Sequence, residues 1–319
     1  MVNRFVIVFC VALTLRAQSG WQSLAHAGQL TREGQFDEAR RIVQSSVDQP
    51  PGSAGVAQLA GALNDLGALC QDLGSNRDAS WYYLKSVSLW NRAPYGPGFT
   101  VTLVNFATLH QHEGRLGEAQ KLYQRAIEIL TAHAELDSAQ AADIYNGLAE
   151  LASLRGRNAE AEDYARRALA IGERCHIPGR AMGMALFHLG AARRARGQLA
   201  EAESFLRRAI EVWEKSLGRD HQTTASGMAY LAAIVSKSVP SEAERLFAEA
   251  LQVYERALGA FHSETGVLLG HYAKHLRSQG RKSEARPLEL RSAAIAERHK
   301  YENPGLYSVD LSALRSRSR

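Results

Sequence analysis

Cysteine is scarce in this chain, and the short motifs that accompany many enzyme activities are missing from it. The 319 residues include only three cysteines. There is no Cys-x-x-Cys pair, no Gly-x-Ser-x-Gly nucleophile elbow, no glycine-rich phosphate loop and no dinucleotide-binding fingerprint. The sequence therefore indicates a non-catalytic protein, and we expect it to hold no cofactor.

A strong excess of one charge is also missing. Lysine and arginine number 38 against 33 aspartate and glutamate residues, which gives a formal charge of +5. Nucleic-acid-binding domains usually concentrate basic residues on one face, and no basic cluster with interleaved aromatic residues occurs in this chain. We expect no nucleic-acid partner, and we interpret the basic run Arg315–Arg319 as a short solvated tail.

Long apolar runs are absent except at the start of the chain. Phe5–Leu15 is apolar apart from Thr14, and it lies between Arg4 and the small-x-small sequence Ala17–Ser19. A membrane-spanning helix needs about 20 residues, so we expect no stable membrane span, whereas the flanks of this run are typical of a secretory signal. We predict a cleavable signal peptide over residues 1–19 and export to the periplasm or the exterior. The alternative is a buried first helix in a cytoplasmic protein.

An internal repeat is the main feature that the chain does contain. An acidic residue followed by alanine recurs at intervals of 40 to 42 residues, at Glu38-Ala39, Asp78-Ala79, Glu118-Ala119, Glu160-Ala161, Glu201-Ala202, Glu242-Ala243 and Glu284-Ala285. A constant period in this range is typical of stacked repeats, in which each unit buries its apolar face against its neighbours. We predict one helical repeat array over residues 20–300, followed by a C-terminal tail over residues 301–319.

Each repeat has the pattern of two helices joined at a glycine. Six turn glycines precede the acidic-alanine pairs, at Gly34, Gly74, Gly114, Gly156, Gly197 and Gly280. Glycine most easily takes the left-handed conformation that ends a helix. In the second helix, the residues four and seven positions after the repeat alanine lie on one face. The fourth is often large, as in Tyr83, Tyr123, Leu206 and Phe247, and the seventh is small, as in Ser46, Ser86, Ala126, Ala168, Ala209, Ala250 and Ser292.

The first helices carry a second marker, a large residue followed by a small one. It occurs at Leu66-Gly67, Phe106-Ala107, Leu148-Ala149, Leu189-Gly190, Leu231-Ala232 and Tyr272-Ala273. Together with the alanine-large-small spacing of the second helices, this combination resembles the tetratricopeptide repeat. The resemblance covers roughly residues 22–296. It implies an all-α, right-handed superhelical solenoid of about seven antiparallel helix pairs.

The repeat length and one recurring loop point to a subclass of that family. The usual tetratricopeptide period is about 34 residues, and the longer period of this chain is similar to that of the kinesin-light-chain-like subclass. The stretches Leu217–Thr224 and Leu258–Thr265 are similar to its Leu-Gly-x-x-His-Pro-x-Thr sequence, although both lack the proline. The subclass resemblance implies no motor-protein role.

Two repeats depart from the pattern. In the sixth, Ser238 replaces the turn glycine, and Leu231 lies 11 residues before Glu242, one fewer than in the preceding repeat. We expect this helix pair to cross at a different angle. The first repeat lacks the large-small pair, as is common for a terminal repeat with one solvated face.

The resemblance also implies where a ligand would bind. In this family the first helix of each pair lines a concave groove, and the residue before the large-small pair commonly projects into it. That column and its neighbours contain our candidate peptide-binding residues, Asn64, Asp65, Asn105, Asn146, His188, Arg194, Tyr230, His271 and Lys274, while Phe187 lies in the adjacent column beside Asn64 and Asn146. An asparagine amide can both donate to and accept from a peptide backbone. We predict a scaffold that binds a protein or peptide segment in the groove.

Several alternatives remain at this point. The same residues could be merely solvated, or the array could self-associate as a structural component through its convex or terminal faces. A metal-dependent enzyme is a third hypothesis, because His271 and His275 are four residues apart on one predicted helix and could share a cation. No third ligand accompanies them, and Tyr272 stands where a metalloprotease motif has glutamate.

The two cysteines outside the signal segment are not expected to bond. Cys70 and Cys175 lie in the second and fourth repeats. Neighbouring helix axes are about 8–10 Å apart, and a disulfide requires Cα atoms within about 7 Å. We interpret Cys70, at an apolar helix position, as a small core residue.

Overall fold

The computed structural model describes residues 22–48, 53–93, 95–177 and 179–302, and every regular element in these ranges is a helix. The predicted signal peptide and residues 303–319 lie outside the described residues. A helix over residues 22–32 is followed by α2 (Phe36–Asp48), α3 (Ser53–Asp72), α4 (Asn76–Trp90), α5 (Gly98–His112), α6 (Leu116–Ala132), α7 (Ala139–Leu154), α8 (Asn158–Cys175), α9 (Gly179–Ala195), α10 (Leu199–Leu217), α11 (Gln222–Val235), α12 (Pro240–Ala257), α13 (Ser263–Ser278) and α14 (Lys282–Glu302).

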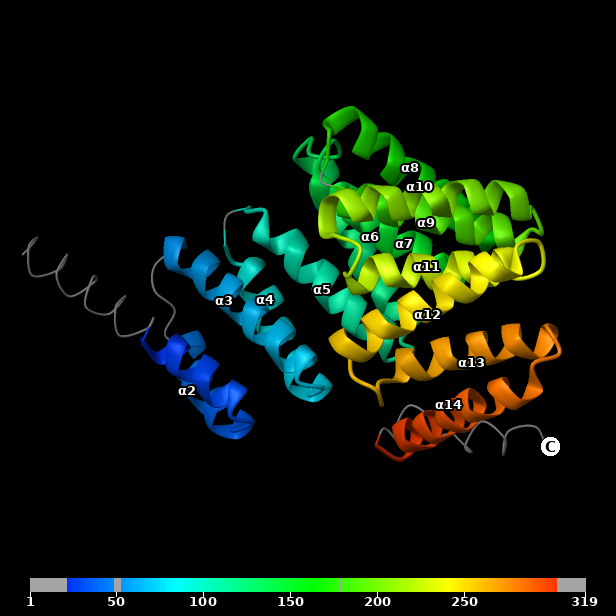
Figure 1. Ribbon diagram of the computed structural model, residues 1–319. Coiled ribbons are helices and arrows are strands. Elements are labelled where there is room, and N and C mark those ends of the chain that lie inside the picture. The colour runs from blue at the N-terminus through cyan, green and yellow to red at the C-terminus, as the bar shows by residue number, and fades with distance from the viewer. Residues whose placement is uncertain (1–21, 49–52, 94, 178, 303–319) are drawn as a thin grey trace, which may run out of the picture. The chain divides into compact units, whose positions relative to one another are not determined.

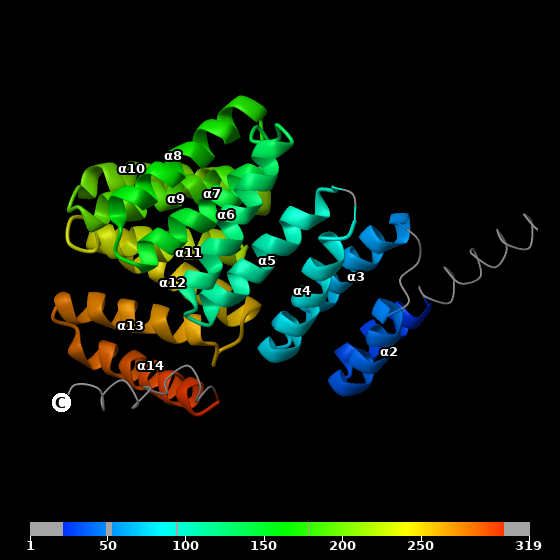
Figure 2. The same ribbon diagram turned by 180° about the vertical axis from the view of Figure 1, so that it is seen from behind.

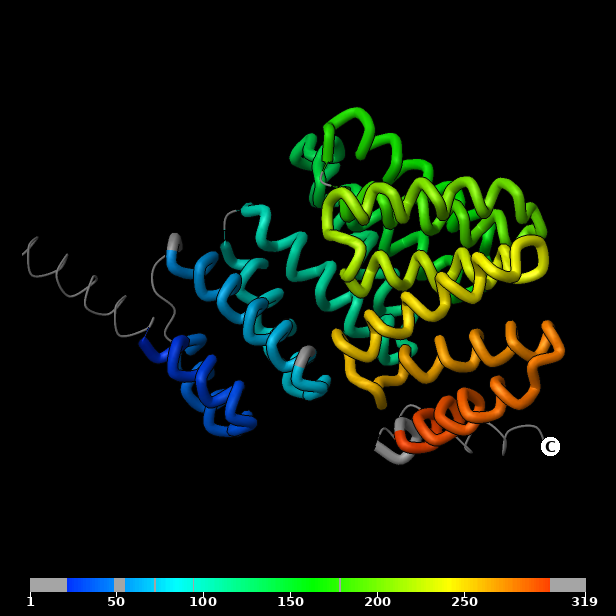
Figure 3. Tube along the Cα trace, viewed as in Figure 1, coloured from blue at the N-terminus to red at the C-terminus, as the bar shows by residue number. Residues whose placement is uncertain are grey.

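These helices form seven sequential pairs, which confirms the predicted all-α array (Figure 1). The chain divides into two compact units, one ending at Leu136 and the other beginning at Asp137. In the first unit α3 packs on α4 and α5 on α6. In the second, the pairs α7/α8, α9/α10, α11/α12 and α13/α14 follow in order, and each pair packs on the next (Figure 2). The order can be traced by colour along the tube (Figure 3).

The six turn glycines have the left-handed backbone that the sequence predicted. Their φ angles lie between +72° and +78°. At Gly74 the turn closes with hydrogen bonds from the Gly74 N–H to the Gln71 carbonyl and from the Ser75 N–H to the Cys70 carbonyl. The bond from Ser75 to Cys70 is the 6→1 bond of the Schellman motif, which ends many helices. A Cβ at any of the six would meet no atom within 4 Å, so backbone conformation and not space requires glycine at these positions.

The predicted small and large residues form the core of each pair. All seven repeat alanines, from Ala39 to Ala285, are fully buried. At Gly67 of α3 a Cβ would lie 2.7 Å from the ring of Tyr83 in α4, so the large side chain of the second helix occupies the space that glycine leaves on the first. The same ring lies 5.7 Å from that of Phe106 in the next pair. The large residue therefore joins its own repeat to the following one.

Cys70 is a buried core residue, as predicted. Both Cys70 and Cys175 are free thiols. Burial, followed by the nearby carboxylate of Asp78, raises the pKa of the Cys70 thiol to about 12. Such a thiol stays protonated at neutral pH and behaves as a small apolar side chain.

The loop that resembles the kinesin-light-chain-like sequence acts as a helix start. In its first copy Gly218 has φ +92°, and the Nδ1 atom of His221 accepts a hydrogen bond from the Thr223 N–H at 3.1 Å. The buried Thr224 hydroxyl donates to the Gly218 carbonyl at 2.8 Å. The second copy repeats both interactions before α13, with Gly259, His262 and Thr265 in the same roles. The histidine thus caps the next helix, and the threonine fastens the loop.

The sixth pair turns without a left-handed residue. Between α11 and α12, residues Ser236–Val239 form the connection, and no residue in it has a positive φ. The Val239 N–H donates to the Val235 carbonyl at 2.8 Å, and Pro240 begins α12. This connection is one residue shorter than in the preceding repeat, and a helix-like hydrogen bond from Val239 to Val235 takes the place of the glycine turn. The altered crossing angle stays a prediction.

Among the described second helices, α14 alone has a charged residue four positions after the repeat alanine. In α12, Phe247 stacks on Tyr272 of the following pair with ring centroids 5.4 Å apart. The corresponding residue of α14 is Glu289, whose carboxylate accepts a hydrogen bond from the Arg277 guanidinium at 2.8 Å. At this position α14 therefore carries a charged residue in an ion pair where α12 carries an aromatic ring.

Among the described residues, no helix combines the length and apolar character needed to cross a membrane.

Candidate functional site

The first helices of the pairs carry the candidate residues, and we call the surface that they form in each unit the first-helix face. In the first unit this face comprises α3 and α5, which pack on one another. In the second unit it comprises α7, α9, α11 and α13, of which α7 packs on α9 and α11 on α13. The predicted residues fall into a polar group in the first unit, a buried group in the second and a mixed cationic and aromatic group in the second.

The polar group of the first unit is a ladder of side-chain amides. The Nδ2 atom of Asn105 in α5 donates to the Oδ1 atom of Asn64 in α3 at 3.0 Å, and Asn64 donates in turn to Asp65 at 3.2 Å. Asn64 is buried, Asn105 half-buried and Asp65 exposed. One turn further along, Gln71 lies 3.5 Å from the ring of His112, again between α3 and α5. Asn105 thereby has a fixed orientation on this face.

The buried group consists of Asn146 and His188, which both lie inside the second unit. Asn146 of α7 donates to the Ala181 carbonyl of α9 at 2.9 Å, and its Oδ1 atom has no partner among the described residues. His188 of α9 is 4% exposed, and burial lowers the pKa of its imidazole to about 4. Neither side chain can reach a ligand at the surface unless α7 or α9 moves. Both belong to the packing between neighbouring first helices.

The third group lies at the surface of α9, α11 and α13, and we call it the cationic patch. It consists of Phe187, Arg194, Tyr230, His271 and Lys274. The guanidinium carbon of Arg194 lies 4.7 Å from the ring centroid of Tyr230, and the Phe187 ring meets the same ring edge-on at 5.0 Å. Arg194 and Tyr230 are half-buried, whereas His271 and Lys274 are exposed.

The charges of this patch act on one another. Partial burial, and then the positive charges of Arg194 and Lys274, lower the pKa of His271. Among the described residues neither Arg194 nor Lys274 forms an ion pair, although most arginines of this unit do. The patch therefore holds cationic charge that the fold does not neutralise. Phe187 belongs to it but was not selected from the sequence, because an aromatic residue beside the groove column is equally compatible with core packing.

The metal hypothesis does not find support in the arrangement of the histidines. His275 is 2% exposed, and its Nδ1 atom is 2.8 Å from the Ser236 hydroxyl. Its ring also packs at 5.7 Å from that of Phe247. His271, four residues earlier, is exposed. Within the described ranges no three His, Cys, Asp or Glu residues are close enough together to hold a metal ion.

A buried carboxylate joins the fourth pair to the fifth. Glu162 of α8 is 4% exposed, and its oxygens accept from Arg193 at 2.7 Å and from Arg196 at 2.8 Å. Arg166, one turn along α8, completes the group at 2.5 Å. Glu162 was not among the residues selected from the sequence. In the sequence, only the distance of 31 and 34 residues from Glu162 to the two arginines points to this contact. That distance can be interpreted only when the packing of the helices is known.

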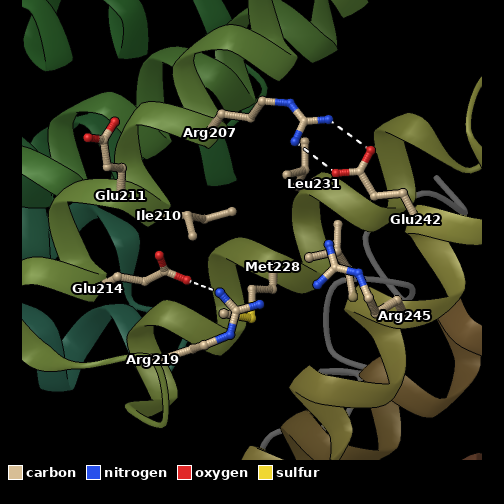
Figure 4. A pocket seen from close by; sticks show the side chains of 10 residues that line it. Arg207, Ile210, Glu211, Glu214, Arg219, Met228, Leu231, Glu242 and Arg245 are labelled. Carbon is tan, nitrogen blue, oxygen red and sulfur yellow. Dashed lines mark hydrogen bonds and ion pairs between the residues drawn. The ribbon is translucent and has the colours of Figure 1, made fainter.

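A hollow bordered by two second helices and one first helix has charged residues that are already paired with one another. It has a volume of about 200 Å³, lies among α10, α11 and α12, and has an apolar floor that includes Met228 and Leu231 (Figure 4). Arg207 at its rim forms two bonds with Glu242, at 2.8 and 2.9 Å. The other two rim arginines, Arg219 and Arg245, are bonded to glutamates as well. This surface therefore has paired charges, unlike the cationic patch.

Comparisons with known proteins agree with this architecture. The sequence profile of the tetratricopeptide repeat matches residues 58–132, 98–174, 181–238 and 240–298, which together make up more than half of the chain. No curated protein matches the sequence.

Solved structures share the fold at low sequence identity. BtubC (BKLC) from P. vanneervenii is 19% identical, with a TM-score of 0.56 over 75% of this chain and 92% of that one. A putative kinesin light chain with tetratricopeptide-like repeats from Podosopora anserina is 17% identical, with a TM-score of 0.50 over 64% and 97%. A Rap protein complexed with competence and sporulation factor is 14% identical, with a TM-score of 0.55 over 88% and 98%. At these identities the likeness concerns the fold alone.

Proposed function

Because the chain belongs to the tetratricopeptide-repeat family, we propose that it is a non-catalytic scaffold that binds a protein or peptide segment on its first-helix face. The observation that carries the proposal is the cationic patch. Tyrosine and arginine are over-represented among the residues that dominate protein interfaces. In this patch Arg194 lies 4.7 Å above the Tyr230 ring, and Phe187 packs against the edge of that ring.

The geometry supports binding because little order has to be created when a partner arrives. Immobilising a flexible side chain at an interface costs about 0.5–1.5 kcal/mol. Arg194 is already held against an aromatic face, and that face is held in turn by Phe187, whose ring also packs 5.9 Å from Trp213 in α10. The part of the cationic patch formed by Phe187, Arg194 and Tyr230 is therefore preorganised.

The first unit offers a second contact of a different kind. Asn105 is half-buried and uses one N–H in its bond to Asn64. Its carbonyl oxygen and second N–H are suited to pair with the backbone of an extended segment. The Rap protein in one of the similar structures is complexed with a factor, which is consistent with a binding role for this repeat architecture.

The test compares crosslinking capture by the wild-type chain with capture by the variant Asn105→Ala/Arg194→Ala/Tyr230→Ala. A control variant carries Gln124→Ala and Arg208→Ala on the second helices. We expect a partner that the wild type and the control capture but the first variant loses. That partner should also bind the purified wild type and control with equal affinity, and the first variant at least ~10-fold more weakly. Equal binding of a verified partner by all three proteins would refute the proposal.

A further inference from the structure

The cationic patch has features that define the chemistry of its ligand, and the inference below rests on the function proposed above. Two cations contribute the charge, and one histidine accompanies them. Arg194 comes from α9, and His271 and Lys274 come from α13, three residues apart and therefore on the same side of that helix. The apolar component is the Tyr230 ring of α11, to which Arg194 is already bound.

The positive charge of the patch is not balanced within the described residues. Arg277 of the same helix bonds Glu289, and Arg281 bonds both Glu244 and Glu284. Arg194 and Lys274 have no such acidic partner among the described residues, and the charged groups that act on His271 are these two cations. Like charges held close together without a counter-charge repel one another, so the arrangement gains stability when an anion enters.

We propose that the cationic patch binds the carboxylate of an acidic protein segment among Arg194, His271 and Lys274, with a neighbouring apolar side chain of that segment on Tyr230. Arginine matches a carboxylate in a planar, two-point geometry, and lysine adds a point charge. The occupant is thus a peptide with at least one Asp or Glu next to an apolar residue. A strongly basic or uncharged segment does not complement this surface.

Binding of this kind has a proton linkage with a predictable sign. The charged groups that act on His271 are Arg194 on α9 and Lys274 on its own helix. A carboxylate placed among them offsets the two cations, so the pKa of His271 is higher in the complex than in the free protein. The complex therefore takes up a proton, and affinity should rise as the pH falls through the pKa that His271 has in the complex.

The experiment uses random peptides displayed on phage and selected on the full chain at neutral pH. We expect selected peptides to be enriched in Asp and Glu beside an apolar residue. The variant Arg194→Glu/Lys274→Glu should bind them at least ~10-fold more weakly. The control Arg208→Glu/Arg286→Glu has the same change in net charge at two exposed second-helix positions and should bind as the wild type does. His271→Gln should bind at pH 8 and should not tighten at lower pH.

The outcomes separate this inference from the function on which it rests. Acidic peptides that are lost only in the patch variant support both. Peptides that bind tightly but are not acidic, or that lose affinity with Asn105→Ala and not with the charge-reversed patch, overturn the acidic-ligand inference and leave the scaffold function standing. If selection yields no peptide that binds the purified chain, both proposals fail.

Discussion

His188 provides a test of the interior of the second unit through its response to acid. The imidazole is fully enclosed, and burial lowers its pKa from the usual 6.5 to about 4. The unfolded chain takes up a proton at this position as the pH falls through 6.5, while the folded chain does so only near 4. The contribution of this neutral imidazole to the free energy of unfolding is therefore complete above the unfolded pKa, and it is lost progressively as the pH falls from 6.5 towards 4.

The size of the loss follows from the two pKa values. Each unit of difference is worth about 1.4 kcal/mol between the two protonation states. Between pH 7 and pH 5 the unfolded imidazole becomes mainly charged while the folded one stays mainly neutral, and the expected loss is about 2 kcal/mol. Because His110 and His275 also have lowered pKa values through burial, the wild-type chain should lose more than this in total. The share of His188 is the difference from a variant that lacks it.

The assay is urea unfolding followed by circular dichroism at pH 7 and at pH 5. His188→Gln keeps a polar side chain but cannot titrate, and we expect it to lose about 2 kcal/mol less than the wild type between the two pH values. His112→Gln is the control, since His112 is exposed on α5, and it should lose as much as the wild type. If His188→Gln folds poorly, His188→Met serves in its place. Equal losses in wild type and in the non-titrating variant would refute a buried neutral imidazole at this position.

Three further predictions concern the turns, a buried ion group and the start of the chain. Gly74→Ala should destabilise the protein by about 1 kcal/mol because φ is +77°, whereas Gly61→Ala within α3, where a Cβ meets nothing within 4 Å, should be neutral or stabilising; thermal unfolding that shifts both variants the same way would contradict this. Glu162→Gln should cost about 3 kcal/mol in urea unfolding because it removes the buried carboxylate that Arg166, Arg193 and Arg196 share, while Glu203→Gln at an exposed pair should cost less than about 1 kcal/mol, and similar costs for the two would argue against the buried group. We also predict cleavage after residue 19 and export in the native host; intact mass spectrometry that finds residues 1–19 on the mature protein would exclude it.

The fold was predictable because its main determinants are local or periodic. A turn glycine needs only its own backbone conformation, and Gly74 and Gly280 have it whatever surrounds them. The repeat alanine and the large residue four positions later recur with the period of the array, so their shared helix face follows from counting. The structure also explains why the loop sequence recurs. His221 caps the start of α11, and Thr224 holds the loop in place by a hydrogen bond to the Gly218 carbonyl.

The candidate site was less predictable because a residue's exposure on the first-helix face depends on how closely neighbouring pairs pack. Asn105 and His188 both directly precede the large-small pair of their helix, yet the first is half-buried on α5 and the second is buried on α9. Asn146 lies inside as well, bonded to the Ala181 carbonyl of α9. Sequence periodicity gives the face of a helix but not the separation of two helices 35 residues apart. Glu162 was not predicted for the same reason, since its partners are Arg193 near the end of α9 and Arg196 just after that helix.

The ion pair on α14 has a bearing on protein engineering. A repeat array can be lengthened only if each added unit finds an apolar docking surface on the last one. At the position four residues after the repeat alanine, α12 has Phe247, whose ring packs on the following pair. At the same position α14 has Glu289, whose carboxylate is already bonded to Arg277. Fusing an eighth helix pair after α14 would bury the Glu289–Arg277 ion pair without giving it a new polar partner. A designer who wishes to extend the solenoid would first replace Glu289 with Phe and Arg277 with an apolar residue, and the native pair can conversely be transplanted to terminate a designed array.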